Sequence, residues 1–105
     1  MALTNVTLTT AAANIFLNAT SGNTAISTIH LCNFTGFTQI ANLYAVPIGK
    51  TAGTSTIIYS NVNISPNNTL IVSAEQIILS SVGDAIMANC GNANAITATV
   101  STRGV

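Results

Sequence analysis

The side chains with the clearest chemical potential in this chain are one histidine and two cysteines. His30 and Cys32 are two positions apart, so on a β-strand they point to the same side. Cys90 could approach them from another strand, and a site with histidine and cysteine ligands would suit zinc. Tetrahedral zinc needs a fourth ligand, which the spacing of the sequence does not offer. We therefore expect packed or partly exposed side chains here, with no metal and no cofactor.

The two cysteines could alternatively form the one disulfide that the chain allows. The first residues contain no Lys or Arg and are interrupted by Asn and Thr, which does not fit a secretory signal. We therefore expect synthesis in a cytoplasm, where thiols stay reduced. The sequence leaves open whether Cys32 and Cys90 are bonded.

A catalytic site is difficult to assemble from these residues. His30 could join a serine and either Asp84 or Glu75 in a triad, but the sequence contains no Gly-x-Ser-x-Gly elbow. Asp84 follows Gly83, and this pair is typical of a tight turn in which the short carboxylate bonds to nearby backbone. We expect Gly83 to adopt a positive φ, which only glycine does freely. The chain is not expected to be an enzyme.

Four aromatic side chains are candidates for a binding surface. Tyr44 and Tyr59 lie within strand-like segments, where a tyrosine is usually a core or interface residue with its hydroxyl at an edge. Phe34 and Phe37 flank a turn, and exposed rings there would form an apolar contact patch. We take all four as candidate interface residues.

Charge is nearly absent from the chain. Only 4% of the 105 residues are charged, whereas an ordinary domain has about a quarter. Two cations cannot neutralise enough phosphates for nucleic-acid binding, and no apolar run is long enough for a membrane-spanning helix. Edge strands normally carry protective charges. We therefore expect self-association into a symmetric homo-oligomer, a trimer rather than a dimer.

Alternation of apolar with polar residues predicts strands throughout a single domain, residues 1–105. In the strongest segment, 24–33, strict alternation places Ile26 on the same face as His30, opposite Ile29. The stretch 73–76 resembles a helix capping box, and there we expect one turn before another short strand. The other expected strands are 3–10, 14–19, 39–46, 55–64, 69–73, 85–90 and 94–101.

About eight short strands separated by regular turns indicate an all-β fold. We expect an antiparallel two-sheet β-sandwich of Ig-like or jelly-roll type. Its outward positions carry Thr, Ser and Asn where most β proteins also place Lys and Glu.

Six stretches occur in an order that is typical of a known family. They are NVTLTT (5–10), GNTAISTIHLCN (22–33), LYAVPIGKTAG (43–53), IYSNVNISPNNT (58–69), VGDAIMA (82–88) and AITATVST (95–102). With this order the chain resembles, over nearly its whole length, small β-sandwich virion proteins of tailed bacteriophages, especially those of marine bacteria and cyanobacteria. Lys50 is a departure, since such loops often contain only Gly and Ser.

The resemblance implies a non-enzymatic structural protein that decorates or cements the capsid or tail apparatus. It would be made in the host cytoplasm, reside in the virion, and dock as symmetric copies on a larger phage coat or tail protein. The family offers no catalytic residues to carry over. The alternative is a receptor- or glycan-binding module at a tail-fibre tip. An exposed Tyr44 or Phe37 in a cleft would favour that alternative.

Overall fold

The computed structural model describes residues 2–18 and 23–104, with the backbone alone at 2, 73–76 and 104. All regular secondary structure in this described part is β. The strands are β1 (Ala2–Thr7), β2 (Ala13–Leu17), β3 (Thr24–Asn33), β4 (Gln39–Val46), β5 (Ile57–Ile64), β6 (Thr69–Leu79), β7 (Ala85–Cys90) and β8 (Ile96–Gly104).

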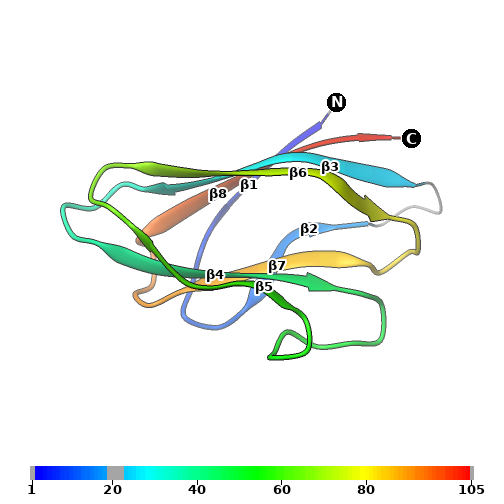
Figure 1. The fold of residues 1–105 in the computed structure, drawn as a ribbon, viewed down its shortest axis with the longest axis horizontal. Coiled ribbons are helices and arrows are strands. Elements are labelled where there is room, and N and C mark those ends of the chain that lie inside the picture. The colour runs from blue at the N-terminus through cyan, green and yellow to red at the C-terminus, as the bar shows by residue number, and fades with distance from the viewer. Residues whose placement is uncertain (1, 19–22, 105) are drawn as a thin grey trace.

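The described strands form two antiparallel sheets that face each other (Figure 1). One sheet has the order β1-β8-β3-β6, here called the first sheet, and the second sheet has the order β2-β7-β4-β5. Pairing is nested along the chain, because β1 pairs with β8, β2 with β7, β3 with β6, and β4 with β5. A nested set of pairs rolled into two sheets is the jelly roll. The predicted two-sheet β-sandwich is confirmed, and the topology is that of the jelly roll.

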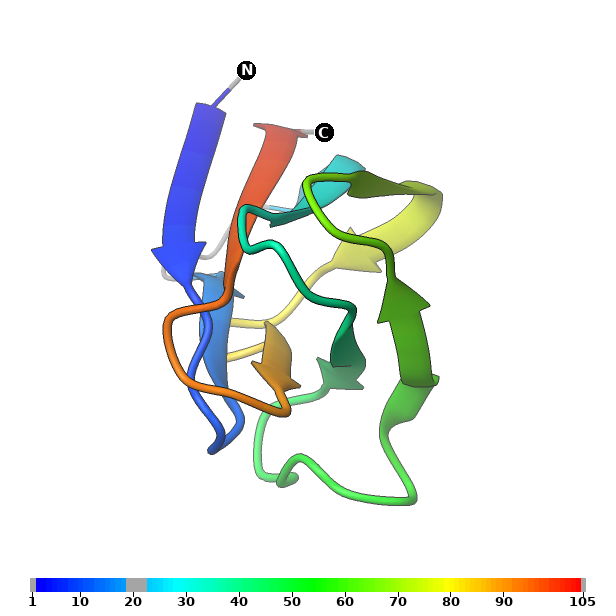
Figure 2. The same cartoon turned by 90° about the vertical axis from the view of Figure 1, so that its left-hand side faces the viewer.

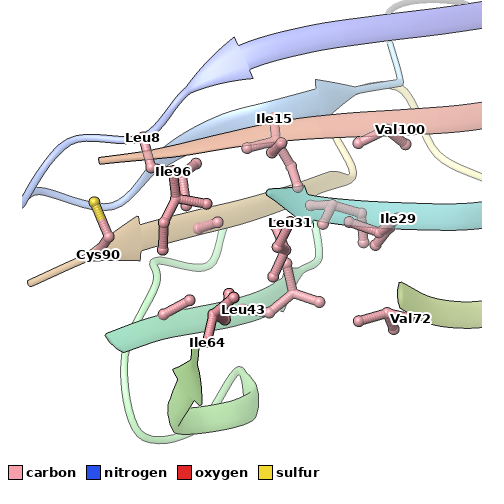
Figure 3. Close-up of a cluster of buried hydrophobic side chains, with 14 of the residues drawn as sticks. Leu8, Ile15, Ile29, Leu31, Leu43, Ile64, Val72, Cys90, Ile96 and Val100 are labelled. Carbon is pink, nitrogen blue, oxygen red and sulfur yellow. The ribbon is translucent and has the colours of Figure 1, made fainter. Parts of the chain in front are cut away.

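The core lies between the two sheets and follows the predicted alternation. In β8, Ile96, Ala98 and Val100 are fully buried, and the residues between them are half-buried on the outer face. Figure 3 shows apolar side chains from both sheets meeting in this layer, among them Leu31 of β3 and Leu43 of β4. Such burial is the main favourable term in folding.

One prediction of strand faces is wrong. Ile26 and Ile29 are both fully buried, although strict alternation places them on opposite faces. The cause is a bulge, because Ile26 pairs with Thr102 whereas Thr28 pairs with Ser101, which leaves Ser27 as an extra residue. An extra residue reverses the alternation for the rest of the strand.

The prediction of a turn at 73–76 is also wrong, since the backbone of β6 runs continuously from Thr69 to Leu79. Its pairing with β3 does shift there: Thr28 faces Ser73, and Ile26 faces Ile77. The capping-box residues thus lie in an irregular stretch of strand, and their side chains are outside the described part. Pairing with β3 outweighs the local signal, because one isolated helical turn is costly to nucleate.

The loops gather at the two ends of a molecule that measures 40 × 27 × 19 Å. The Asn33 end contains loops 34–38, 65–68 and 91–95, and the Asp84 end contains loop 47–56 and turn 80–84 (Figure 1). Figure 2 looks onto the Asn33 end and shows β1 and β2 on one side of the sandwich and β5 and β6 on the other. These four strands are the sheet edges.

Candidate functional site

The structure does not bring the histidine and the two cysteines together. His30 and Cys32 are half-buried on the outer face of the first sheet, beside Thr99 and Thr97 of β8. Cys90 is buried in β7 of the second sheet, where its Sγ lies 2.8 Å from the Asn92 carbonyl oxygen. Both cysteines are free. Within the described residues, no group of three or more His, Cys, Asp or Glu could hold a metal ion.

Burial also affects the chemistry of Cys90, because it raises the pKa of that thiol. A raised pKa lowers the thiolate fraction at neutral pH and makes the sulfur a poor nucleophile. Cys90 therefore acts as a packed side chain in the core. Cys32 is the more accessible of the two thiols.

Asp84 joins two connections at its end of the sandwich. Its carboxylate accepts hydrogen bonds from the backbone N–H groups of Ile48 at 3.0 Å, Ser81 at 3.0 Å and Ser80 at 3.2 Å. These bonds lower the pKa of Asp84, and the bond from Ile48 has the largest effect. Gly83 has φ +100°, so the predicted turn is confirmed. Asp84 lies in the turn before β7 of the second sheet and His30 on the outer face of the first, so the two do not form a triad.

Asn33 performs the corresponding role at the other end, which the sequence reasoning missed. The side chain is fully buried, and its Nδ2 donates to the carbonyl oxygens of Phe37 at 2.7 Å, Ile64 at 3.0 Å and Ser65 at 3.2 Å. Its Oδ1 accepts from the N–H of Thr35 at 3.0 Å and from the Thr35 hydroxyl at 2.7 Å. The available signal was an Asn two residues before a Thr at a strand end, which favours such local bonding.

The network around Asn33 continues across the end of the sandwich. Gln39 donates from Nε2 to the Thr35 hydroxyl at 3.1 Å, and Asn92 donates from Nδ2 to Gln39 Oε1 at 3.0 Å. Asn67 also donates its N–H to the Thr35 carbonyl at 3.1 Å. Three loops are therefore held to one another by polar groups that carry no charge.

Three of the four candidate aromatic residues are on the surface. Phe37 is 77% exposed, more than any other large apolar residue in the described part, and Phe34 is 51% exposed. Tyr59 is exposed on β5. Tyr44 is buried, in register with Met87 and Ile57, so it belongs to the packing of the domain and not to its exposed surface.

Each edge strand carries at least one exposed large apolar side chain. Charged residues do not protect these edges, since β1, β2 and β5 contain none and β6 contains only Glu75. The exposed edge residues are Leu3 on β1, Leu17 on β2, Ile58 and Tyr59 on β5, and Ile71 and Ile78 on β6.

An apolar pocket of about 160 Å³ opens at the Asp84 end. It lies where the last residues of β4 approach those of β6, and Asp84 is its only charged lining residue. The apolar lining comes mainly from Ala45, Val46, Pro47, Ile77, Leu79 and Ala85. Exposed Ile48 and Val82 are on the connections at the same end.

The described residues include no helix that is long and apolar enough to cross a membrane. Comparison of the chain with protein-family models, with curated proteins and with solved structures finds no match in any of the three.

Proposed function

We propose that this protein is a non-enzymatic structural component of a tailed-bacteriophage particle. It decorates or cements the capsid or tail apparatus through symmetric self-association and docks on a larger coat or tail protein. The observation that supports self-association and docking is the surface of the jelly roll: exposed large apolar residues on every described edge strand and at both ends, with almost no charge.

The physical argument rests on what such a surface does in water. Each exposed apolar group gains about 25 cal/mol per Å² when a partner covers it. Unpaired strand edges without charged residues readily pair with another strand. Hydroxyl and amide groups pair with one another on this surface, as the Thr99 hydroxyl does when it donates to Asn5 at 2.8 Å, so a partner can cover them without the desolvation cost of charges.

The fold adds support only by analogy. Jelly rolls occur in viral capsid domains, but also in lectins and cupins, and one architecture hosts many functions. The phage assignment therefore depends on the resemblance of the ordered sequence stretches, to which the fold adds a compatible architecture.

The receptor- or glycan-binding alternative has weaker support from the aromatic residues. A stacking platform requires accessible rings beside polar groups in a recess. Tyr44 is buried, and Phe37 belongs to an exposed loop and does not line the pocket at the Asp84 end. An exposed apolar loop that is not in a recess favours contact with another protein.

The first test is whether the chain belongs to a particle. Mass spectrometry of purified particles of the encoding phage should detect the chain in many copies, and electron microscopy should place it at symmetric positions. Purified protein should sediment as an oligomer, with a trimer expected, at micromolar concentration. A chain that is absent from purified particles, or that remains monomeric at high micromolar concentration, would contradict the proposal.

The second test addresses docking through the edges. Ile71→Lys adds a charge to the exposed edge strand β6, and we expect it to reduce incorporation into particles at least tenfold. Ile40→Lys makes the same change at an exposed position on β4, which is paired on both sides, and is the matched control. Equal incorporation of the two variants would argue against edge docking.

A further inference from the structure

We propose that the two ends of the sandwich are complementary, so that Phe37 of one copy inserts into the apolar pocket at the Asp84 end of the next. The inference rests on the proposed self-association and specifies the contact that produces it. The edge strands then remain available for the larger coat or tail protein.

The inserting group is exposed and held in place. The Phe37 ring is 77% exposed, while the Phe37 carbonyl oxygen accepts the 2.7 Å hydrogen bond from buried Asn33. Because the loop backbone is fixed before contact, little conformational freedom is lost when the ring is bound. Loop 34–38 contains no charged residue, so nothing in it opposes burial.

The pocket has the size and lining that one phenyl ring requires. Its volume is about 160 Å³, and an apolar protein cavity of about 150 Å³ is known to bind benzene. Its lining is aliphatic except for Asp84, whose charge is already stabilised by three backbone N–H groups. Exposed Ile78 also lines the pocket, and exposed Ile48 and Val82 on the nearby connections offer apolar area around a docked loop.

The placement of the two features determines the kind of assembly. Loop 34–38 lies at one end of the long axis, and the last residues of β4 and β6, which line the pocket, lie at the other (Figure 1). One copy can therefore insert its Phe37 side chain into the pocket of a second copy while its own pocket receives Phe37 of a third. This contact is heterologous, and heterologous contacts close into rings or continue as filaments.

The area involved favours a closed ring. An aromatic side chain buries roughly 150–250 Å², so Phe34, Phe37 and an equal area of the pocket together remain below the 1,200–2,000 Å² that both partners of a stable interface typically bury. A single contact is therefore weak, whereas every copy in a ring makes two. The smallest closed arrangement is two antiparallel copies that exchange both contacts, and the expected trimer is the next one.

The experiment uses two variants that each disable one half of the contact. Phe37→Ser removes the ring and keeps the pocket, and Ile78→Lys places a charge at the pocket and keeps the ring. Both positions are exposed, so folding should be retained and can be checked by thermal melts. Leu3→Ser is the matched control, because Leu3 is 72% exposed but lies on β1.

Sedimentation velocity should show each variant alone with self-association weakened at least tenfold. Because a single contact is weak, the equimolar mixture is examined at the highest protein concentration that stays in solution. There it should form a heterodimer that grows no further, because only one phenyl ring and one open pocket remain compatible. The control should assemble like the wild type. A mixture that stays monomeric would overturn the inference, and so would single variants that assemble like the wild type. In the latter case the protein would still self-associate, so the proposed function would stand; a monomeric wild type would contradict both.

Discussion

Each end of the sandwich contains a polar side chain that joins the connections there, and the two side chains differ in kind. Asn33 is a fully buried neutral amide with five hydrogen bonds to loops 34–38 and 65–68 and the end of β5. Asp84 is a partly exposed carboxylate that accepts three backbone N–H bonds from two connections. A buried group must be neutral and fully paired, because burying a charge is far more costly.

A second polar side chain, Asn18, also joins the connections at the Asp84 end. Buried Asn18 donates from Nδ2 to the carbonyl oxygens of Leu79 at 3.1 Å and Ser81 at 3.0 Å, and Gly83 donates its N–H to the Asn18 carbonyl at 2.9 Å. The loss of Asp84 therefore leaves its turn partly supported. At the other end, the bonds of Gln39, Asn67 and Asn92 also join the loops, but Asn33 alone makes five side-chain bonds from inside the fold. The comparison therefore predicts unequal sensitivity of the two ends.

The largest effect is expected from Asn33→Ala. The substitution leaves the buried Ile64 carbonyl oxygen without this donor and removes the bonds to Phe37 and Thr35, and each unsatisfied buried group costs about 1–3 kcal/mol. The Ser65 carbonyl oxygen still accepts a hydrogen bond from the Asn68 N–H at 3.2 Å. We expect the free energy of unfolding to fall by about 3 kcal/mol, measured by urea denaturation. Asn63→Ala, at an exposed position on β5, is the control. If Asn33→Ala lowers the free energy of unfolding no more than Asn63→Ala does, the two ends do not differ in sensitivity.

The strands could be predicted from the sequence because their signal is local. Apolar residues at every second position reproduce the bounds of β3, β4 and β7 without error. Gly83 and Asp84 were also predictable, since a positive φ and a short carboxylate are properties of the turn itself. The bond from Ile48 to Asp84 was not predictable, because it joins residues that are 36 positions apart.

The missed features all depend on tertiary pairing. The bulge at Ser27 is defined by the pairing of β3 with its neighbours β8 and β6, and the 73–76 stretch stays in strand β6 while β6 pairs with β3. Asn33 resembles any other Asn in an Asn-rich chain until the fold surrounds it with carbonyl groups. Tyr44 is buried although its own strand signal would fit either face. The pocket belongs to two sheets and has no sequence signature.

A smaller effect is expected from Gly83→Ala at the Asp84 end. At φ +100° an added Cβ is strained, and it would lie 2.7 Å from Cδ1 of Ile48. Cγ1 and Cβ of Ile48 also lie 2.9 and 3.3 Å from the added atom, so the exposed Ile48 must shift. Backbone strain of about 1–3 kcal/mol adds to that cost. Gly36→Ala is the matched control, since Gly36 has open space around its Cβ position and no positive φ. Thermal melts that show the two substitutions to be equally mild would argue against strain at this turn.

The smallest effect should appear as pH dependence confined to the Asp84 end. The pKa of Asp84 is lower in the folded chain than its usual value of about 4. A carboxyl group with a lowered folded pKa stabilises the protein fully above its unfolded pKa. That stability is lost as the pH falls from about 4 through the folded pKa. Because solvent reaches this carboxylate, we expect a loss of about 1 kcal/mol or less, measured by urea denaturation at successive pH values.

Asp84→Asn separates this contribution from general acid effects. An amide has one accepting oxygen, so at neutral pH the variant should already have lost most of what protonation removes, and its acid dependence should be weaker than that of the wild type. Glu75→Gln removes the only other side-chain carboxylate of the chain and is the control. The assignment to Asp84 requires that the Glu75 variant keep the wild-type acid dependence. If that variant loses it instead, the carboxylate at the end of the sandwich is not the group that titrates.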